Sequence, residues 1–161
     1  MKLVIAGVSG SGKTTIGTLV AKLSNSEFLD ADSFHPPENV EKMRHGIPLT
    51  DADRAGWLQT LGTELQHRSD VVLACSALKK AYRDLLRGAV PDLQFALLEL
   101  SKSELEKRIA GRARTGHFMP ASLLDSQLAT LETGEDLLVF ENNDSPEIIA
   151  RKIWEKTIAD R

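Results

Sequence analysis

A glycine-rich stretch near the amino terminus restricts the fold of this chain more than any other feature. Residues 7–14 read Gly-Val-Ser-Gly-Ser-Gly-Lys-Thr and directly follow the apolar run Leu3-Val4-Ile5-Ala6. The stretch fits the pattern G-x-x-x-x-G-K-[ST], a loop between a buried strand and a helix whose backbone N–H groups wrap a polyphosphate. The alternative is a flexible glycine and serine turn. We favour the phosphate-binding interpretation because a strand-like run precedes the loop and helical periodicity follows it.

The residue types in this loop suit the binding of a nucleotide and its metal. Glycines permit a tight loop, and the helix that begins near Lys13 adds the positive end of its dipole. Lys13 is expected to reach the β- and γ-phosphates, and the Thr14 hydroxyl is expected to bind Mg²⁺. The residues of this segment that we predict to bind the nucleotide are Gly7, Ser9, Gly10, Ser11, Gly12, Lys13, Thr14 and Thr15.

Composition limits the remaining possibilities. With 161 residues, of which 42% are hydrophobic, the chain suits one domain over 1–161 that buries its own core. The formal net charge of −3 gives no basic excess that would point to nucleic acid. The single Cys75 suits a reducing compartment. No stretch approaches the roughly 20 apolar residues of a membrane span, and the run before Gly7 is too short for a signal peptide. We expect a soluble, cytoplasmic protein that binds neither nucleic acid nor a membrane.

Hydrophobic periodicity predicts alternating strands and helices. Strands are expected over 2–6, 27–30, 71–75, 94–98 and 137–140. Helices are expected from the loop to about Ser24, from Glu38 to Gly46, from a cap at 50–53 past Leu65, and over 79–87, 103–113, 122–132 and 145–159. Five strands separated by helices indicate a three-layer α/β/α fold with a five-stranded parallel sheet. The segment 111–122 mixes glycines, cations and an apolar Phe-Met pair, and we interpret it as a mobile lid.

Ligands of such sheets bind beyond the carboxyl ends of the strands, which brings the loop near Asp30, Asp32, Ser76 and residues 142–144. Because side chains alternate along an extended segment, Asp30 and Asp32 are predicted to share one side of it. Opposite a phosphate-binding loop, Asp30 suits the binding of Mg²⁺ through water, and Asp32 suits acceptance of a proton from an attacking hydroxyl. The alternative is that either carboxylate simply caps the following turn.

Cations and histidines gather in the segments predicted to surround the same crevice. Arg108 and Arg112 are four residues apart and share a helix face, and phosphoryl transfer needs such cations to stabilise the transferred group. Solvated helix faces carry such charges routinely, so this pattern alone does not decide. His35 and His117 flank the crevice and are equally compatible with a structural role. Cys75 lies inside an apolar strand, where an inert thiol is expected.

Taken together, these motifs resemble those of the gluconokinases, the small P-loop kinases that phosphorylate gluconate. Besides the loop, the matching segments are residues 30–36 (Asp-Ala-Asp-Ser-Phe-His-Pro), 51–58 with Asp53-Arg54 and Trp57-Leu58, 75–79 with Tyr82-Arg83-Asp84, and Arg112 with 117–120 (His-Phe-Met-Pro) and Ser126-Gln127. They occur in the family's order and span nearly the whole chain. Ala31 stands where the family commonly has glycine, and Gly56 where it commonly has proline.

The resemblance implies an activity and a set of residue roles. The activity is ATP-dependent, in-line transfer of a phosphoryl group to the terminal hydroxyl of D-gluconate, giving 6-phosphogluconate. Asp32 would act as the base, and Lys13 and Arg112 would stabilise the transferred group. Mg²⁺ would be bound by Thr14 and Asp30, and the nucleotide base by Arg108 and Asn143. The residues expected to bind gluconate are Asp32, His35, Arg54, Lys79, Arg83 and His117.

The family resemblance also implies a homodimer. The sequence leaves two other functions open. One is a kinase for a different anionic acceptor, such as shikimate or a nucleotide, because a cationic pocket suits any carboxylate. The other is a nucleotide-binding switch without an acceptor, because nucleotide binding alone does not distinguish a kinase from a switch.

Overall fold

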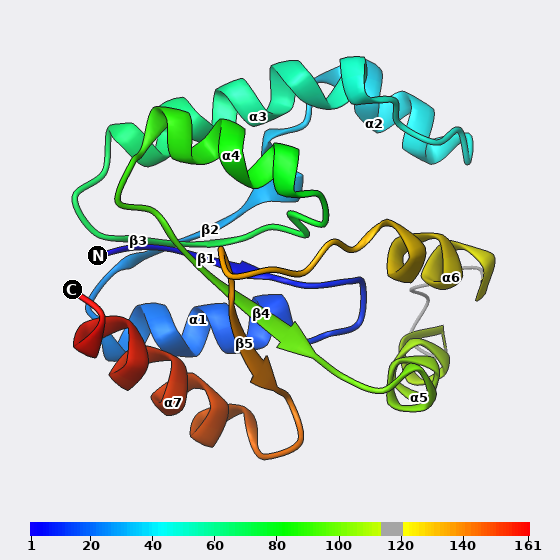
Figure 1. Ribbon diagram of the computed structural model, residues 1–161. Helices are drawn as coiled ribbons and strands as arrows, with labels where there is room; N and C mark the ends of the chain where they lie inside the picture. Colours follow the sequence, from blue (N-terminus) through cyan, green and yellow to red (C-terminus); the bar gives the residue numbers. More distant parts are fainter. Residues whose placement is uncertain (114–120) are drawn as a thin grey trace.

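The computed structural model describes residues 1–113 and 121–161 as one parallel sheet between layers of helices (Figure 1). The strands lie in the order β2-β3-β1-β4-β5, and every neighbouring pair is parallel. Their bounds are β1 Lys2–Ala6, β2 Glu27–Asp30, β3 Val71–Ala74, β4 Gln94–Glu99 and β5 Leu138–Glu141. The predicted three-layer fold with five parallel strands is confirmed.

Helices cover both faces of the sheet, and further helices lie beyond the carboxyl ends of the strands (Figure 1). α3 and α4 pack on one face, and α1 and α7 on the other. The bounds are α1 Lys13–Leu23, α2 Pro37–Arg44, α3 Asp51–Gln66, α4 Lys80–Ala89, α5 Lys102–Ala113, α6 Ala121–Thr130 and α7 Pro146–Ala159, with a short 3₁₀ helix, η1, over Ala31–Phe34. No helix in the described part of the chain is both long enough and apolar enough to cross a membrane.

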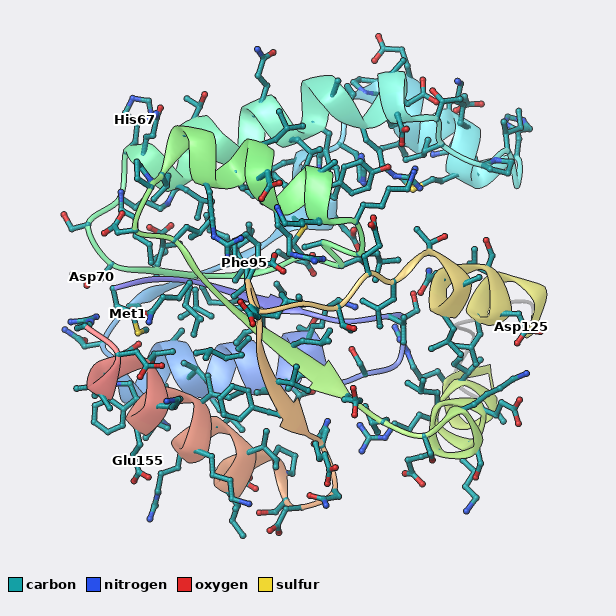
Figure 2. All side chains as sticks on the ribbon, in the orientation of Figure 1. Met1, His67, Asp70, Phe95, Asp125 and Glu155 are labelled. Atoms are coloured by element: carbon teal, nitrogen blue, oxygen red, sulfur yellow. The ribbon has the colours of Figure 1, made fainter. Side chains whose placement is uncertain are left out.

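The central strands are apolar on both sides because each side faces a different core. One core contains Val4 and Phe95 from the sheet with Trp57 from α3, and Phe95 points toward the α3 and α4 layer (Figure 2). The other contains Ile5 from the sheet and Ile153 from α7. Adjacent positions of β1 therefore serve opposite cores, and burial of both rows holds the strand ends in register beside the loop.

Local sequence signals explain where the helices that carry the site begin. α3 starts with a capping box, in which the Thr50 hydroxyl accepts from the Asp53 N–H and the Asp53 carboxylate accepts from the Thr50 N–H. α1 has no side-chain cap, and its N-cap residue Gly12 adopts the left-handed conformation. The first turn of α1 therefore presents free N–H groups toward the loop, as anion binding at a helix start requires.

The prediction that Asp30 and Asp32 share one extended segment is wrong. The chain turns into η1 directly after Asp30, and Asp32 lies within that helix. The predicted lid, 111–122, falls largely outside the described residues, since only its first residues, in α5, and its last, in α6, belong to the described ranges.

Candidate active site

The glycine-rich loop lies where the connections of the sheet diverge. From β1 the chain runs through α1 to the edge strand β2, whereas from β4 it runs through α5 and α6 to the opposite edge strand β5. β1 and β4 are neighbours in the sheet. In doubly wound sheets, the crevice between two such strands is where ligands bind. The loop over residues 7–12 occupies this position.

Glycine is required at two points of the loop. A Cβ on Gly7 would lie 2.5 Å from the Ser11 Oγ, closer than side-chain atoms approach one another. Gly12 has a φ of 95°, and a Cβ there would lie 3.1 Å from the Asn142 Nδ2 and 3.4 Å from an Arg108 guanidinium nitrogen. The Ser11 hydroxyl is buried without a hydrogen-bond partner in the described structure. The loop is thus a tight backbone cradle.

Lys13 lies close to the charged groups expected to act with it. Its ammonium donates to the Val8 carbonyl at 3.0 Å. Burial lowers the pKa of Lys13, while the negative charges of Asp32 and, more weakly, Asp30 act against this lowering. The positive charge of Arg112 lowers the pKa of Lys13 further. The structure therefore brings the predicted residues Lys13, Asp30, Asp32 and Arg112 within electrostatic reach of one another.

The two acidic residues at the end of β2 have different surroundings. The Asp30 Oδ1 accepts the N–H of Asp32 at 3.0 Å, so Asp30 caps η1, as the alternative interpretation of these residues held. Its other carboxylate oxygen is not used by this cap. Asp32 is exposed in the first turn of η1. Asp32 is therefore the carboxylate that a bound acceptor could reach directly.

His35 is held rigidly beside Asp32. Its ring stacks on Trp57 with centroids 4.3 Å apart and planes 13° apart, and the Asn39 amide lies 3.2 Å from its Nδ1. The Trp57 Nε1–H donates to the Ala31 carbonyl at 2.8 Å, which ties η1 to α3. Burial lowers the pKa of His35, the charge of Asp32 opposes this, and Arg54 adds to it. The neutral imidazole is thereby favoured near pH 7.

Two predicted cations, Arg54 and Lys79, gather around Tyr82. The Arg54 guanidinium carbon lies 5.8 Å and the Lys79 ammonium 5.5 Å from the centre of the Tyr82 ring. The Asp51 carboxylate accepts hydrogen bonds from Lys79, at 3.2 Å, and from the Tyr82 hydroxyl. Asp51 and Tyr82 were not predicted as site residues, although both stand in segments that match the family. Together these four groups form a polar cluster that suits an anionic, hydroxylated ligand.

Arg83 contradicts its predicted role in substrate binding. Its side chain is 1% exposed and all three guanidinium nitrogens are engaged within the protein. NH1 donates to the Ala77 and Leu78 carbonyls at 2.8 and 3.1 Å, and NH2 to the Glu132 carbonyl at 2.8 Å. Nε donates to the Asp136 carboxylate at 2.7 Å. Arg83 is a structural residue that fastens the loop after β3 to the segment before β5.

Residues predicted to contact the base line a cleft on the other side of the loop. Arg108 from α5 and Asn143 from the segment after β5 face a cavity of about 760 Å³. Asn142 donates to the Ser11 carbonyl at 2.8 Å and so joins this cleft to the loop. Thr14 and Thr15 are exposed in the first turn of α1. His117, also predicted to bind substrate, lies outside the described residues.

Ser9 differs from the other loop residues predicted to bind the nucleotide. Its N–H donates to the Gln127 Oε1 at 2.7 Å, and its hydroxyl accepts from the Gln127 Nε2 at 3.2 Å. In this conformation neither group of Ser9 is directed at a phosphate. Gln127 was predicted only as part of a segment that matches the family. The positions of Ser9 and Gln127 in the sequence give no sign that they meet in the fold.

The donor set fits magnesium better than a metal held by protein side chains alone. Among residues 1–113 and 121–161, no group of three or more histidine, cysteine or acidic side chains could enclose an ion. Mg²⁺ is usually bound through one or two protein ligands, several waters and substrate phosphates. Thr14 and the carboxylate of Asp30, beside a phosphate-binding loop, are compatible with that mode.

Comparisons with known proteins agree with this geometry. A family model described as an AAA domain matches residues 3–133. A gluconokinase of Gluconobacter oxydans is 45% identical over 158 residues, covering 94% of this chain and 88% of that protein. A gluconokinase of Arabidopsis thaliana is 42% identical over 170 residues, covering 95% and 90%.

Solved structures extend the similarity to three dimensions. The crystal structure of a gluconokinase from Sinorhizobium meliloti 1021 superposes with a TM-score of 0.89 at 44% identity, covering 98% of this chain and 91% of that one. A shikimate kinase from Acinetobacter baumannii, at 19% identity and a TM-score of 0.66, shares the fold. The glycine cradle, the sheet order and sequence identity over most of the chain lead to one conclusion: this chain is a kinase that belongs to the gluconokinase family.

Proposed function

We propose that this enzyme transfers the γ-phosphoryl group of ATP to the terminal hydroxyl of D-gluconate and forms 6-phosphogluconate. The observation that carries the proposal is that the loop after β1 and Asp32 just past β2 lie at the same edge of the sheet, because Ile5 of β1 and Asp30 of β2 both pair with Ala74 of β3. Lys13, which would bind the phosphates, and the exposed carboxylate of Asp32 would thus act on the same space. In-line transfer needs a donor phosphate and an acceptor hydroxyl to meet between such groups.

The donor side would be formed by the loop and the cleft beside it. The N–H groups of the cradle and of the first turn of α1 would bind the phosphates, and the base would enter the cleft between Arg108 and Asn143. When bound, Mg²⁺ would be held by Thr14 and, through water, by Asp30, and would neutralise charge on the phosphates.

The acceptor side would be formed by η1 and the polar cluster around Tyr82. Gluconate carries one carboxylate, which suits Arg54 and Lys79, and several hydroxyls, which suit His35 and Asp51. Asp32 would orient the terminal hydroxyl and accept its proton as the oxygen attacks the γ-phosphorus and ADP leaves. Lys13 and Arg112 would stabilise the charge on the transferred group.

A coupled assay of ADP release across a panel of acceptors tests the proposal. The panel comprises gluconate, other sugar acids, shikimate, AMP and a sample without acceptor. We expect turnover to be highest with gluconate, and ³¹P NMR to show the product phosphate on the terminal carbon. Preferred turnover of shikimate or AMP would reject the assigned acceptor. ATP hydrolysis that no acceptor stimulates would instead favour a nucleotide switch.

A further inference from the structure

The clearest feature left unexplained by the proposed chemistry is the contact between α6 and the glycine loop. Gln127, from the middle of α6, meets Ser9 with both ends of its side-chain amide, accepting from the Ser9 N–H at 2.7 Å and donating to the Ser9 hydroxyl at 3.2 Å. An amide that uses its acceptor and its donor on the same residue fixes that residue's orientation. Gln127 is half-buried, so the pair is partly shielded from water.

Packing and an ion pair fix α6, which carries Gln127, against α5 and the glycine loop. Leu124 of α6 is buried against Leu105 of α5 and Val8 of the loop, in a small cluster separate from the two main cores. Lys102 of α5 and Asp125 of α6 form an ion pair at 2.8 Å. Asp125 lies on the side of α6 that faces away from the sheet (Figure 2).

The chain just after α6 is fixed as well. The N–H of Glu132 donates to the Leu78 carbonyl at 2.8 Å, and the Glu132 carbonyl accepts from the buried Arg83. α6 therefore bridges two segments at the carboxyl edge of the sheet, the glycine loop after β1 and the loop after β3. A side chain projecting from α6 holds the loop against a fixed support.

We propose that Gln127 is a positioning residue for nucleotide binding, which holds the glycine loop in its phosphate-ready shape before ATP arrives. A loop with glycines at residues 7, 10 and 12 has much conformational freedom to lose on binding a ligand. Gln127 removes part of that freedom in advance by anchoring Ser9, whose N–H and hydroxyl are turned toward α6. The inference rests on the proposed use of ATP at this loop and is independent of the acceptor.

Three variants separate this role from general destabilisation. Gln127→Ala removes both hydrogen bonds to Ser9. Gln127→Glu keeps an acceptor for the Ser9 N–H, and the Ser9 hydroxyl can rotate to donate to the second carboxylate oxygen. Ser126→Ala changes the neighbouring exposed side chain on the same helix and serves as the matched control.

Amide hydrogen exchange at Ser9, followed by NMR, and titration with a non-hydrolysable ATP analogue and Mg²⁺ test the proposal on the full chain. In Gln127→Ala we expect the Ser9 amide to exchange at least tenfold faster, with the amides of β1 unchanged, and the analogue to bind about tenfold more weakly. The KM for the acceptor should stay within about twofold of the wild type. Gln127→Glu should retain the slow exchange at Ser9, and Ser126→Ala should match the wild type throughout.

Unchanged exchange at Ser9, or unchanged affinity for the analogue, in Gln127→Ala would overturn the inference. So would an equal loss in the Ser126→Ala control, because the effect would then belong to α6 as a whole. Failure of the wild-type protein to bind the ATP analogue would reject the proposed function instead, and the two failures are therefore distinguishable.

Discussion

Replacing Arg83 with leucine and Lys79 with methionine separates two cations that the sequence placed in the same predicted pocket. Arg83→Leu removes an ion pair with Asp136 and hydrogen bonds to the Ala77, Leu78 and Glu132 carbonyls, all around a side chain that is 1% exposed. Loss of one partner from a buried charged network costs about 3–5 kcal/mol. Lys79 is 36% exposed and solvent screens its ion pair with Asp51, so its replacement should leave stability almost unchanged.

Thermal and urea unfolding measure these differences directly. For a domain of this size, each kcal/mol shifts Tm by about 2–4 °C, so Arg83→Leu should lower Tm by roughly 6–20 °C. In steady-state kinetics at a temperature where both variants are folded, Lys79→Met should raise the KM for gluconate at least tenfold. Arg83→Leu should leave that KM within about threefold. A stable Arg83→Leu variant with a large KM defect would refute the structural role assigned to this arginine.

Further experiments test other parts of the structure. Lys13→Ala should reduce turnover by at least a hundredfold without altering the circular dichroism spectrum, because it removes the cation at the phosphates; a variant with near-normal turnover would contradict this. Cys75 should resist iodoacetamide at pH 8 in the folded protein and react in urea, because burial raises the pKa of its thiol to about 12; rapid labelling of the folded protein would show that the strand end is open. Gly56→Ala should raise the free energy of unfolding by about 0.5–1 kcal/mol, since Gly56 lies inside α3 with open space at its Cβ position. Gly17→Ala, where a Cβ would lie 2.9 Å from the Phe28 ring, should lower it, and equal effects at both positions would contradict the packing.

Hydrophobic periodicity and capping signals predicted the order and type of the strands and α-helices in the described part of the chain, but not the short helix η1. The apolar run 71–75 gave a central strand because both faces of β3 are covered, and Thr50 with Asp53 marked the start of α3 because their capping box is local. The glycine loop was equally predictable, since the requirements at Gly7 and Gly12 are visible in the pattern itself.

Local turn chemistry and long-range contacts both limited the prediction of the site. Alternation placed Asp30 and Asp32 on one side of a strand, but the N–H of Asp32 bonds to the Asp30 carboxylate and the chain turns there. Arg83 looked like a substrate ligand by its charge, whereas the distant Glu132 carbonyl and Asp136 carboxylate occupy it, together with two carbonyls of the nearby loop after β3. Such roles depend on which segments meet in the fold, and a single sequence does not state this.

The partnership of Ser9 and Gln127 shows the same limit most clearly. Ser9 lies in the loop after β1 and Gln127 lies in α6, far along the chain. Nothing in the sequence of either segment marks the two residues as a pair. A glutamine inside a helix pattern is usually a solvated surface residue. Only the packing of α6 against the loop turns it into a contact that bears on nucleotide binding.

Single-turnover transfer of the γ-phosphoryl group to gluconate by Asp32→Asn, compared with the wild type, tests the central claim most directly. The substitution keeps the shape of the side chain and removes its ability to accept a proton. We expect transfer to slow by about 10²–10⁴-fold, as for loss of a general base, with the affinities for ATP and gluconate within about threefold of the wild type. Transfer at near the wild-type rate would contradict the assignment of Asp32 as the base between donor and acceptor.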